Sequence, residues 1–286
     1  MAVSVLTDSL ASIPPADAEA AGVGVVSLYI NDGDTNQREL DMDVSAFYRR
    51  LGDMRTVPTS SQPSPEALLL AFRQALEHGS DALGIFVSGQ MSGTLEAARI
   101  AADMVLAETP GARIELIDSG SNSMEEGFGV LAAAEAARAG ETIERCIERA
   151  QETLARTRYL FTPETLEYLR RGGRIGAASA LLGGLLQIRP ILTVENGVTT
   201  TFSKVRTHTK ALSEIARTFS DDIAAYGFRR VIVHYIGEPD SAETFAREQI
   251  EPHVGETVRV MPVSPVIGLH VGPAVGIVYE TERAWT

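Results

Sequence analysis

Serine, threonine and aspartate residues gather in four short segments of the first half of the chain. The segments are TDS at residues 7–9, TSSQPS at 59–64, SGQMSGT at 88–94 and DSGSNS at 118–123. Hydroxyl groups and the free N–H groups of helix starts are donors that suit an oxyanion, either a carboxylate or a phosphate. For any single segment, helix capping is the ordinary interpretation, and Ser123 with Glu126 fits a capping box. The four segments together favour an oxyanion-binding site.

Ser92 lies between an apolar run and a helical pattern, where α/β enzymes often carry a nucleophile. Residues 89–93 read GQMSG, which differs from the G-x-S-x-G pattern of the nucleophile elbow. A serine nucleophile also requires a base, and His270, in a predicted glycine-flanked loop, is the most suitable histidine. A Ser92–His270 pair with Asp8 or Asp118 would make a serine hydrolase or thioesterase, which stays open as the less favoured hypothesis.

Composition and the absence of common motifs exclude several other functions. The formal net charge of the 286 residues is −13, which argues against general binding to nucleic acid or to an anionic membrane. A single cysteine, Cys146, forms neither an internal disulfide nor a CxxC metal site, so we expect a reducing cytoplasm. The chain lacks GxGxxG, GxxxxGK[ST] and HExxH motifs, so we expect no nucleotide cofactor and no metal. The apolar stretch 180–192 is too short to span a membrane and contains Arg189.

The hydroxyl-rich segments are positioned by alternating strands and helices in the first half of the chain. Apolar runs predict strands over residues 3–6, 23–30, 83–87 and 113–117, and helical periodicity predicts helices over 65–78, 95–107, 124–138 and 141–157. This alternation favours a parallel sheet covered by helices on both faces, that is, an α/β/α domain. The carboxyl ends of parallel strands meet at one edge, where ligands bind.

The second half of the chain has a different pattern. Thr162 and Pro163 predict the start of a short helix that ends at residues 172–173. A hairpin is predicted over 188–202, with its turn at Asn196-Gly197. A further helix is expected over 208–219 and strands over 231–236, 258–263 and 276–279. We therefore predict an α/β protein with an N-terminal α/β domain, residues 1–158, and a mixed α+β domain, residues 159–286.

The ordered set of motifs resembles the DegV family of fatty-acid-binding proteins. The resemblance rests on TDS at 7–9, SSQPS at 60–64, SGQMSGT at 88–94, DS at 118–119, LEYLRRGGRI at 166–175, LLQIRPIL at 185–192, KVRT at 204–207 and HVGPAVG at 270–276. Each motif alone is weak, but the set runs through the chain in the family's order. The family usually has threonine where Ser60 stands, and serine keeps the hydroxyl donor.

The resemblance implies a binding subunit without catalysis of its own, located in the cytoplasm. Family members hold one long-chain fatty acid in a tunnel, and the best understood bacterial members present its carboxylate to a kinase subunit for acyl-phosphate formation in phospholipid synthesis. The matching carboxylate holders are Ser60, Ser92 and His270, and the kinase-docking arginines are Arg174 and Arg206. Further expected ligand contacts are Ser61, Gly93, Thr94, Asp8 and Ser119. A carrier of another amphiphile is the remaining alternative.

Overall fold

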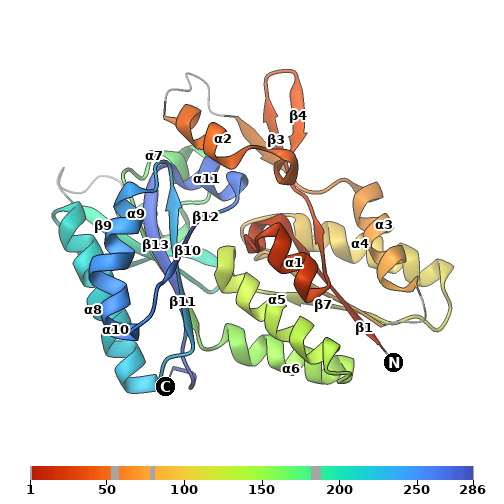
Figure 1. The fold of residues 1–286 in the computed structure, drawn as a ribbon. Coiled ribbons are helices and arrows are strands. Elements are labelled where there is room, and N and C mark those ends of the chain that lie inside the picture. Colours follow the sequence, from red (N-terminus) through yellow and green to blue (C-terminus); the bar gives the residue numbers. More distant parts are fainter. Residues whose placement is uncertain (1, 53–57, 78–80, 182–187, 286) are drawn as a thin grey trace. The chain divides into compact units, whose positions relative to one another are not determined.

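The chain forms two compact units in a computed structural model that describes residues 2–52, 58–77, 81–181 and 188–285 (Figure 1). The first unit comprises Met1–Asp41 and Ser60–Ala155, and the second comprises Met42–Thr59 and Arg156–Thr286. The sequence predicts a division at residue 158, close to the boundary between Ala155 and Arg156, but gives no indication that Met42–Thr59 groups with the second unit.

The first unit contains a four-stranded parallel sheet in the order β2–β1–β6–β7. Its strands are β1 (Val3–Asp8), β2 (Val23–Val26), β6 (Asp81–Phe86) and β7 (Ile114–Asp118). The expected parallel sheet is confirmed. The single strand predicted over 23–30 is wrong, because β2 ends at Val26. The N–H of Leu28 turns to donate to the Ser9 hydroxyl (2.8 Å) before the next strand begins.

Helices pack on both faces of this sheet. The helices are α1 (Pro15–Ala21), α3 (Pro65–Ala75), α4 (Thr94–Glu108), α5 (Ser123–Arg138) and α6 (Ile143–Leu154), with the 3₁₀ turns η1 (Ser9–Ala11) and η2 (Glu39–Asp41). Leu68 and Phe72 of α3 are fully buried in a core shared with Leu6 and Phe86 of the sheet. The predicted end of α3 at residue 78 lies outside the described residues. A separate small sheet has the order β4–β3–β5 and comprises β3 (Tyr29–Asp32), β4 (Thr35–Arg38) and β5 (Thr59–Ser61).

The second unit contains a mixed six-stranded sheet in the order β10–β9–β8–β13–β11–β12. Its strands are β8 (Thr157–Pro163), β9 (Arg189–Glu195), β10 (Val198–Val205), β11 (Arg230–Ile236), β12 (Arg259–Pro262) and β13 (Ala274–Glu280). The β9–β10 hairpin is confirmed, with Asn196 and Gly197 at positive φ as a type I′ turn requires. Only β11 and β12 pair in parallel among these described strands.

The helix start predicted at Thr162 and Pro163 is wrong. Both residues end β8, where they pair with Val275 and Ala274 of β13. A Thr-Pro pair fits a helix start and also a strand end, and pairing with a strand more than a hundred residues away decides between them. The following helix, α7, begins only at Glu167 and ends at Arg171.

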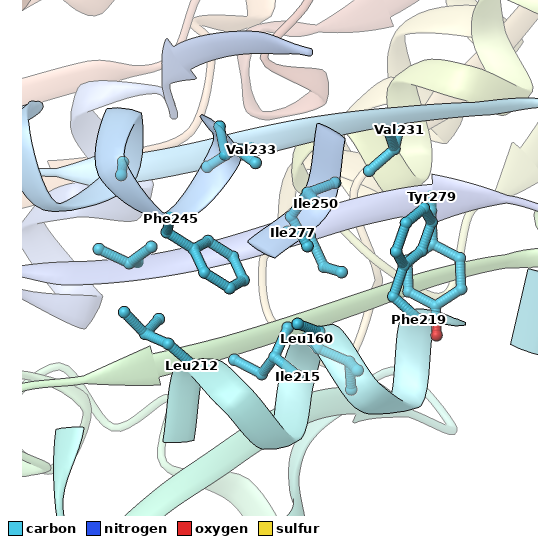
Figure 2. Packing of buried hydrophobic residues seen from close by; sticks show 14 of the residues in the cluster. Leu160, Leu212, Ile215, Phe219, Val231, Val233, Phe245, Ile250, Ile277 and Tyr279 are labelled. Atoms are coloured by element: carbon cyan, nitrogen blue, oxygen red, sulfur yellow. The ribbon is translucent and has the colours of Figure 1, made fainter. Parts of the chain in front are cut away.

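The core of the second unit lies between its sheet and α8 (His208–Tyr226), which continues beyond the predicted end at Phe219. Figure 2 shows Leu212, Ile215 and Phe219 of α8 directed at Leu160 and Ile277 of the strands. The remaining elements are α2 (Val44–Leu51), η4 (Gly176–Leu181), α9 (Asp240–Phe245), η5 (Ala246–Ile250), α10 (Glu251–Val254) and α11 (Pro265–Val271).

Tyr48 of α2 explains why Met42–Thr59 groups with the second unit. The Tyr48 side chain is buried, and its hydroxyl lies 3.0 Å from the carbonyl oxygens of both Val263 and Ser264. These acceptors immediately precede α11, so α2 and α11 pack together although they are separated by more than two hundred residues.

Candidate functional site

Three of the four hydroxyl-rich segments meet at the carboxyl edge of the parallel sheet. The N–H of Val87 donates to Asp8 (2.8 Å), the N–H of Ser88 to the carbonyl of Ser121 (2.8 Å), and the N–H of Gly89 to Asp118 (3.3 Å). These bonds join the ends of β1, β6 and β7. The convergence follows from the parallel order of the strands, as the sequence predicts.

The fourth segment lies beside the Ser92 loop within the first unit. A Cβ built on Gly93 would overlap the side-chain oxygen of Gln62, which follows β5 directly. Glycine at position 93 therefore allows the two segments to approach each other closely. This contact brings the segment that carries Ser60 and Ser61 to the loop that carries Ser92.

Ser92 is half-buried, and its hydroxyl has local partners. Its Oγ lies 2.9 Å from Thr94 Oγ1 and accepts the N–H of Thr94 at 3.3 Å. The N-cap of α4 is Gly93, which has no capping side chain, so the Ser92 hydroxyl receives an N–H that the helix start leaves open. Ser92 thus contributes to the helix start while it stays partly exposed in the loop.

Ser60 and Ser61 are both half-buried in β5. Ser61 accepts a weak hydrogen bond from the side-chain amide of Asn31 (3.4 Å). Ser64, by contrast, caps α3 by accepting the N–H of Ala67 (3.2 Å), so the last hydroxyl of this segment serves the helix. Successive strand side chains point to opposite faces, so Ser60 and Ser61 face opposite ways.

Asp8 and Ser119 are held mainly by their own backbone surroundings. Both oxygens of the fully buried Asp8 carboxylate accept N–H groups, one from Leu10 and one from Val87, each at 2.8 Å. The Ser119 hydroxyl donates to the carbonyl oxygen of Ser121 and accepts the N–H of Ser121, each at 3.2 Å. Burial raises the pKa of Asp8 to about 7 against these two donors. Their ligand contacts remain predictions.

Glu126 is a buried acid that the sequence does not single out as part of the site. The capping box predicted for Ser123 and Glu126 is wrong: Asn122 is the N-cap, and Glu126 instead accepts the Thr7 hydroxyl at 3.0 Å. Burial raises the pKa of Glu126 well above its ordinary value, and the nearby Asp8 raises it further. Because a serine followed three residues later by a glutamate is the pattern of a capping box, the sequence does not indicate that the Glu126 side chain points into the protein.

His270 belongs to the second unit and lies in the last turn of α11, so the predicted loop is wrong. Ser264 caps this helix by accepting the N–H of Ile267 (3.3 Å), and Pro265 occupies its first turn. The Ser264-Pro265 pair is therefore the sequence pattern that indicates the start of α11. Burial, together with the positive charge of Arg174, lowers the pKa of His270 to about 4. The imidazole is therefore neutral at neutral pH.

The two expected docking arginines are exposed in the second unit. Arg174 follows α7, and its guanidinium donates to the carbonyl of Gly172 (2.5 Å). Arg206 follows β10 directly and precedes Thr207, which caps α8. Gly172 is the C-cap of α7, as the sequence predicts. The first three residues of the LLQIRPIL motif, 185–187, lie outside the described residues.

The described residues show no cluster of three or more His, Cys, Asp or Glu side chains arranged for a metal ion. Across the same residues, none of the helices has the length and apolar character needed to cross a bilayer.

Comparison with known proteins identifies the family. Residues 2–282 match the family described as "Uncharacterised protein, DegV family". The chain belongs to the DegV family. A DegV domain-containing protein of Clostridium acetobutylicum is 40% identical over 284 residues, which cover 99% of both chains.

Solved structures of DegV proteins share the fold over nearly the whole chain. A DegV family protein from Thermus thermophilus, described by its fatty acid binding, has a TM-score of 0.86 and 30% identity, with 98% of this chain and 100% of that chain covered. DegV from Bacillus subtilis, described as a fatty acid binding protein, has a TM-score of 0.87 and 29% identity, with 98% and 99% covered. The resemblance stated from the motifs is thus confirmed.

Proposed function

We propose that this chain binds a long-chain fatty acid and presents its carboxylate to a partner kinase, without catalysing a reaction itself. The observation that carries the proposal is the close approach of the Ser60 segment to the Ser92 loop through Gln62 and Gly93, in a chain that matches fatty-acid-binding DegV proteins along its length. Ser60 and Ser92 are half-buried hydroxyls, so they can donate to a ligand carboxylate.

The free energy of fatty acid binding divides between the apolar tail and the polar carboxylate head. Burying about 14 methylenes of a sixteen-carbon chain at roughly 0.8 kcal/mol each contributes about 11 kcal/mol before the costs of association. The tail therefore supplies affinity, while the buried carboxylate requires hydrogen-bond donors. We propose that Ser60, Ser92 and His270 supply them, with Ser61, Gly93, Thr94, Asp8 and Ser119 as further contacts.

Neutral donors fit a carboxylate that must remain a nucleophile. The lowered pKa of His270 leaves a neutral imidazole at neutral pH, and serine hydroxyls carry no charge. A carboxylate held by such donors keeps more electron density on its oxygens than one paired with arginine. In the proposed reaction, one carboxylate oxygen bonds to the terminal phosphorus of a nucleoside triphosphate held by the kinase. The bond to the nucleoside diphosphate breaks, and Arg174 and Arg206 are the proposed docking residues.

Native mass spectrometry of the protein purified from cells tests the proposal directly. We expect a bound mass in the C14–C18 fatty acid range. A different amphiphile, such as a sterol or retinoid, would replace this proposal with the broader carrier hypothesis. Turnover of a p-nitrophenyl ester that disappears in Ser92→Ala would support the hydrolase hypothesis instead.

A Ser92→Ala variant tests the headgroup assignment. We expect affinity for palmitate to fall at least about tenfold, because a hydrogen bond to a charged group contributes about 1.5–3 kcal/mol. Thr59→Ala is a matched control, since the Thr59 side chain is exposed next to Ser60 on the same strand. Unchanged palmitate binding by Ser92→Ala would show that the headgroup lies elsewhere.

A further inference from the structure

Three aromatic rings of the second unit lie against glycines around α11. A Cβ on Gly268 would come within 2.6 Å of the Tyr48 hydroxyl oxygen, and a Cβ on Gly272 within 2.7 Å of Tyr168 Cε2. A Cβ on Gly172 would overlap the imidazole of His270. The contacts between α7 and α11 are reciprocal, because the glycine after each helix receives the ring carried by the other. Such contacts fix α11, and with it His270, against α2 and α7.

Gly172 contacts the Nδ1 edge of the His270 ring. The Cβ position at Gly172 overlaps Nδ1 and lies 3.2 Å from Cε1 and 3.3 Å from Cγ. The Nε2 atom is therefore on the ring edge that points away from this glycine. The close approach of Gly172 thus orients the His270 ring so that Nε2, and not Nδ1, points away from the α7 turn.

Gly172 is required for space and not for backbone conformation. Its φ of −72° and ψ of −11° are helical, so an alanine adopts them without strain. The next residue, Gly173, differs because its φ of +71° favours glycine and its Cβ position is open. The two glycines of the GGR turn are therefore required for different reasons. Gly172 leaves space for the His270 ring, whereas Gly173 adopts a positive φ.

Arg174 is bonded to the backbone of the same turn. Its guanidinium donates to the carbonyl oxygen of Gly172 (2.5 Å), and its N–H donates to the carbonyl of Leu169 (3.0 Å). The neighbouring Arg170 and Arg171 both pair with Glu167, so a carboxylate of α7 already offsets their charges. The exposed guanidinium of Arg174, the Gly172 backbone and the His270 ring thus form one line of contacts from the surface inward.

We propose that Gly172 is a positioning residue for the His270 imidazole and that Arg174 couples this position to the protein surface. The inference rests on the proposed role of His270 in holding the fatty acid carboxylate. An aspartate or glutamate of a docking partner that pairs with Arg174 would compete with the Gly172 carbonyl and offset the charge that faces His270. Docking would then alter the donor that holds the carboxylate.

A Gly172→Ala variant of the full chain tests the positioning step, with ¹⁵N-labelled histidine observed by NMR. We expect the ring signals of His270, assigned with His270→Gln, to move and its tautomer ratio to change. We also expect palmitate affinity to fall about tenfold, as for a lost hydrogen bond to a charged group. Gly52→Ala is the matched control, because Gly52 is also a helical C-cap (φ −67°) and its Cβ position is open.

The outcomes separate this inference from the proposed function. Unchanged His270 signals in folded Gly172→Ala would overturn the positioning role. Moved signals with unchanged palmitate affinity would support positioning and refute the role of His270 in holding the carboxylate.

Variants of Arg174 test the coupling, and they keep the inference testable if Gly172→Ala does not fold. We expect Arg174→Gln to raise the pKa of His270, measured by NMR titration, because a positive charge that disfavours the imidazolium is removed. Arg174→Lys should return the pKa toward the wild-type value. An identical His270 pKa in wild type and Arg174→Gln would overturn the coupling.

Discussion

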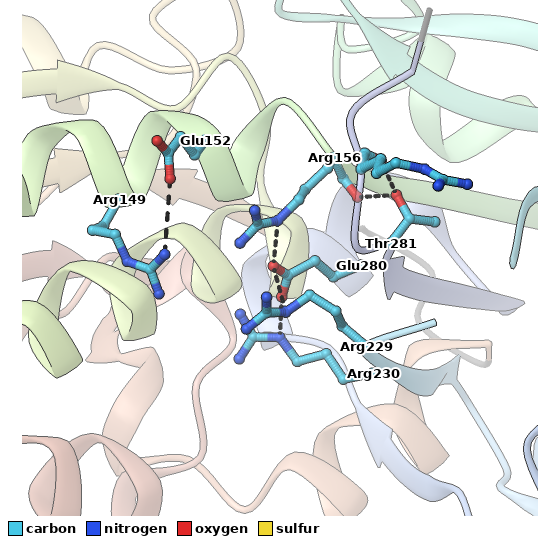
Figure 3. Close-up of polar contacts among 8 residues, drawn as sticks. Arg149, Glu152, Arg156, Arg229, Arg230, Glu280 and Thr281 are labelled. Carbon is cyan, nitrogen blue, oxygen red and sulfur yellow. Dashed lines mark hydrogen bonds and ion pairs between the residues drawn. The ribbon is translucent and has the colours of Figure 1, made fainter. Parts of the chain in front are cut away.

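Two buried glutamates, one in each unit, have opposite surroundings. Glu126 of the first unit is 0% exposed, and its Oε1 accepts the Thr7 hydroxyl at 3.0 Å. Glu280 of the second unit is 1% exposed and meets three arginines, Arg156 (2.8 Å), Arg229 (3.4 Å) and Arg230 (2.6 Å), as Figure 3 shows. The first unit therefore buries a carboxyl group whose raised pKa favours the neutral acid, whereas the second buries a carboxylate with its counter-charges.

The difference follows from where each glutamate lies. Glu280 ends β13 in the middle of the second sheet, where Arg230 pairs with it across β11 and where strand ends bring arginines together. Glu126 lies in the first turns of α5, next to the segments that we propose bind the ligand. Among the described residues, the buried side-chain atoms without a hydrogen-bond partner include Asn122 Oδ1, Ser123 Oγ and Glu126 Oε2. Two further such atoms, Thr162 Oγ1 and His234 Nε2, lie in the second unit, whereas the three of the first unit all lie at the start of α5, beside the proposed site.

Removal of the Glu280 charge should have the largest effect on stability. Glu280→Gln leaves three arginines without their shared counter-ion, and loss of one partner of a buried ion pair costs about 3–5 kcal/mol. Since Arg229 and Arg230 are 44% and 36% exposed, we expect the lower part of that range, measured by urea unfolding at pH 7. Glu282→Gln, at an exposed position two residues on, should leave the stability unchanged. A loss below about 1 kcal/mol, typical of a surface pair, would contradict the comparison.

The two units should also respond oppositely to pH, and His234 gives the clearest case in the second. Burial lowers its pKa to about 4, while an unfolded histidine titrates near 6.5. The unfolded state therefore binds more protons between these values, so the free energy of unfolding falls as the pH drops from 6.5 to 4. The full shift corresponds to about 3 kcal/mol.

A His234→Gln variant isolates this contribution. It should lose less stability than wild type between pH 6.5 and 4, measured by urea unfolding at several pH values, because glutamine does not titrate. His253→Gln is the control, since His253 is exposed on α10. Parallel curves for wild type and His234→Gln would show that the buried imidazole is not the source of the acid sensitivity.

Local sequence patterns predict the parallel sheet well, but they predict contacts between residues far apart in the sequence poorly. Strand–helix alternation gives the strand directions, and these bring Asp8, Ser88 and Asp118 to one edge. The Asn196-Gly197 turn likewise needs only its own residues. By contrast, Tyr48 bonds to carbonyls more than two hundred residues away, and no local pattern encodes that contact.

The errors in the predicted site have the same physical origin. His270 is flanked by glycines, which suggested a loop, but those glycines admit the rings of neighbouring helices. Ser123 and Glu126 have the spacing of a capping box, but Thr7 of β1 draws the glutamate inward. In each case, the residue type is correctly noticed and a tertiary contact changes its role.

Glu126 provides the pH effect of opposite sign that completes the comparison. Its pKa is raised by burial, so the folded state binds more protons than the unfolded state above pH 4.5. The free energy of unfolding therefore falls as the pH rises, by up to about 1.4 kcal/mol per pH unit while Glu126 remains protonated in the fold. Glu126→Gln resembles the neutral acid in shape and should flatten this slope above pH 4.5.

The matched control for Glu126 is Glu135→Gln, an exposed position on the same helix. Urea unfolding of both variants at each pH separates the buried acid from the general effect of replacing a glutamate on this helix, since both changes replace one carboxyl group by an amide. Asp8, whose pKa is raised to about 7, contributes a slope of the same sign below that pH in every variant. The difference in slope between wild type and Glu126→Gln above pH 4.5 therefore isolates the Glu126 contribution. Equal slopes for Glu126→Gln and wild type in that range would mean that Glu126 is buried as an ion, as Glu280 is.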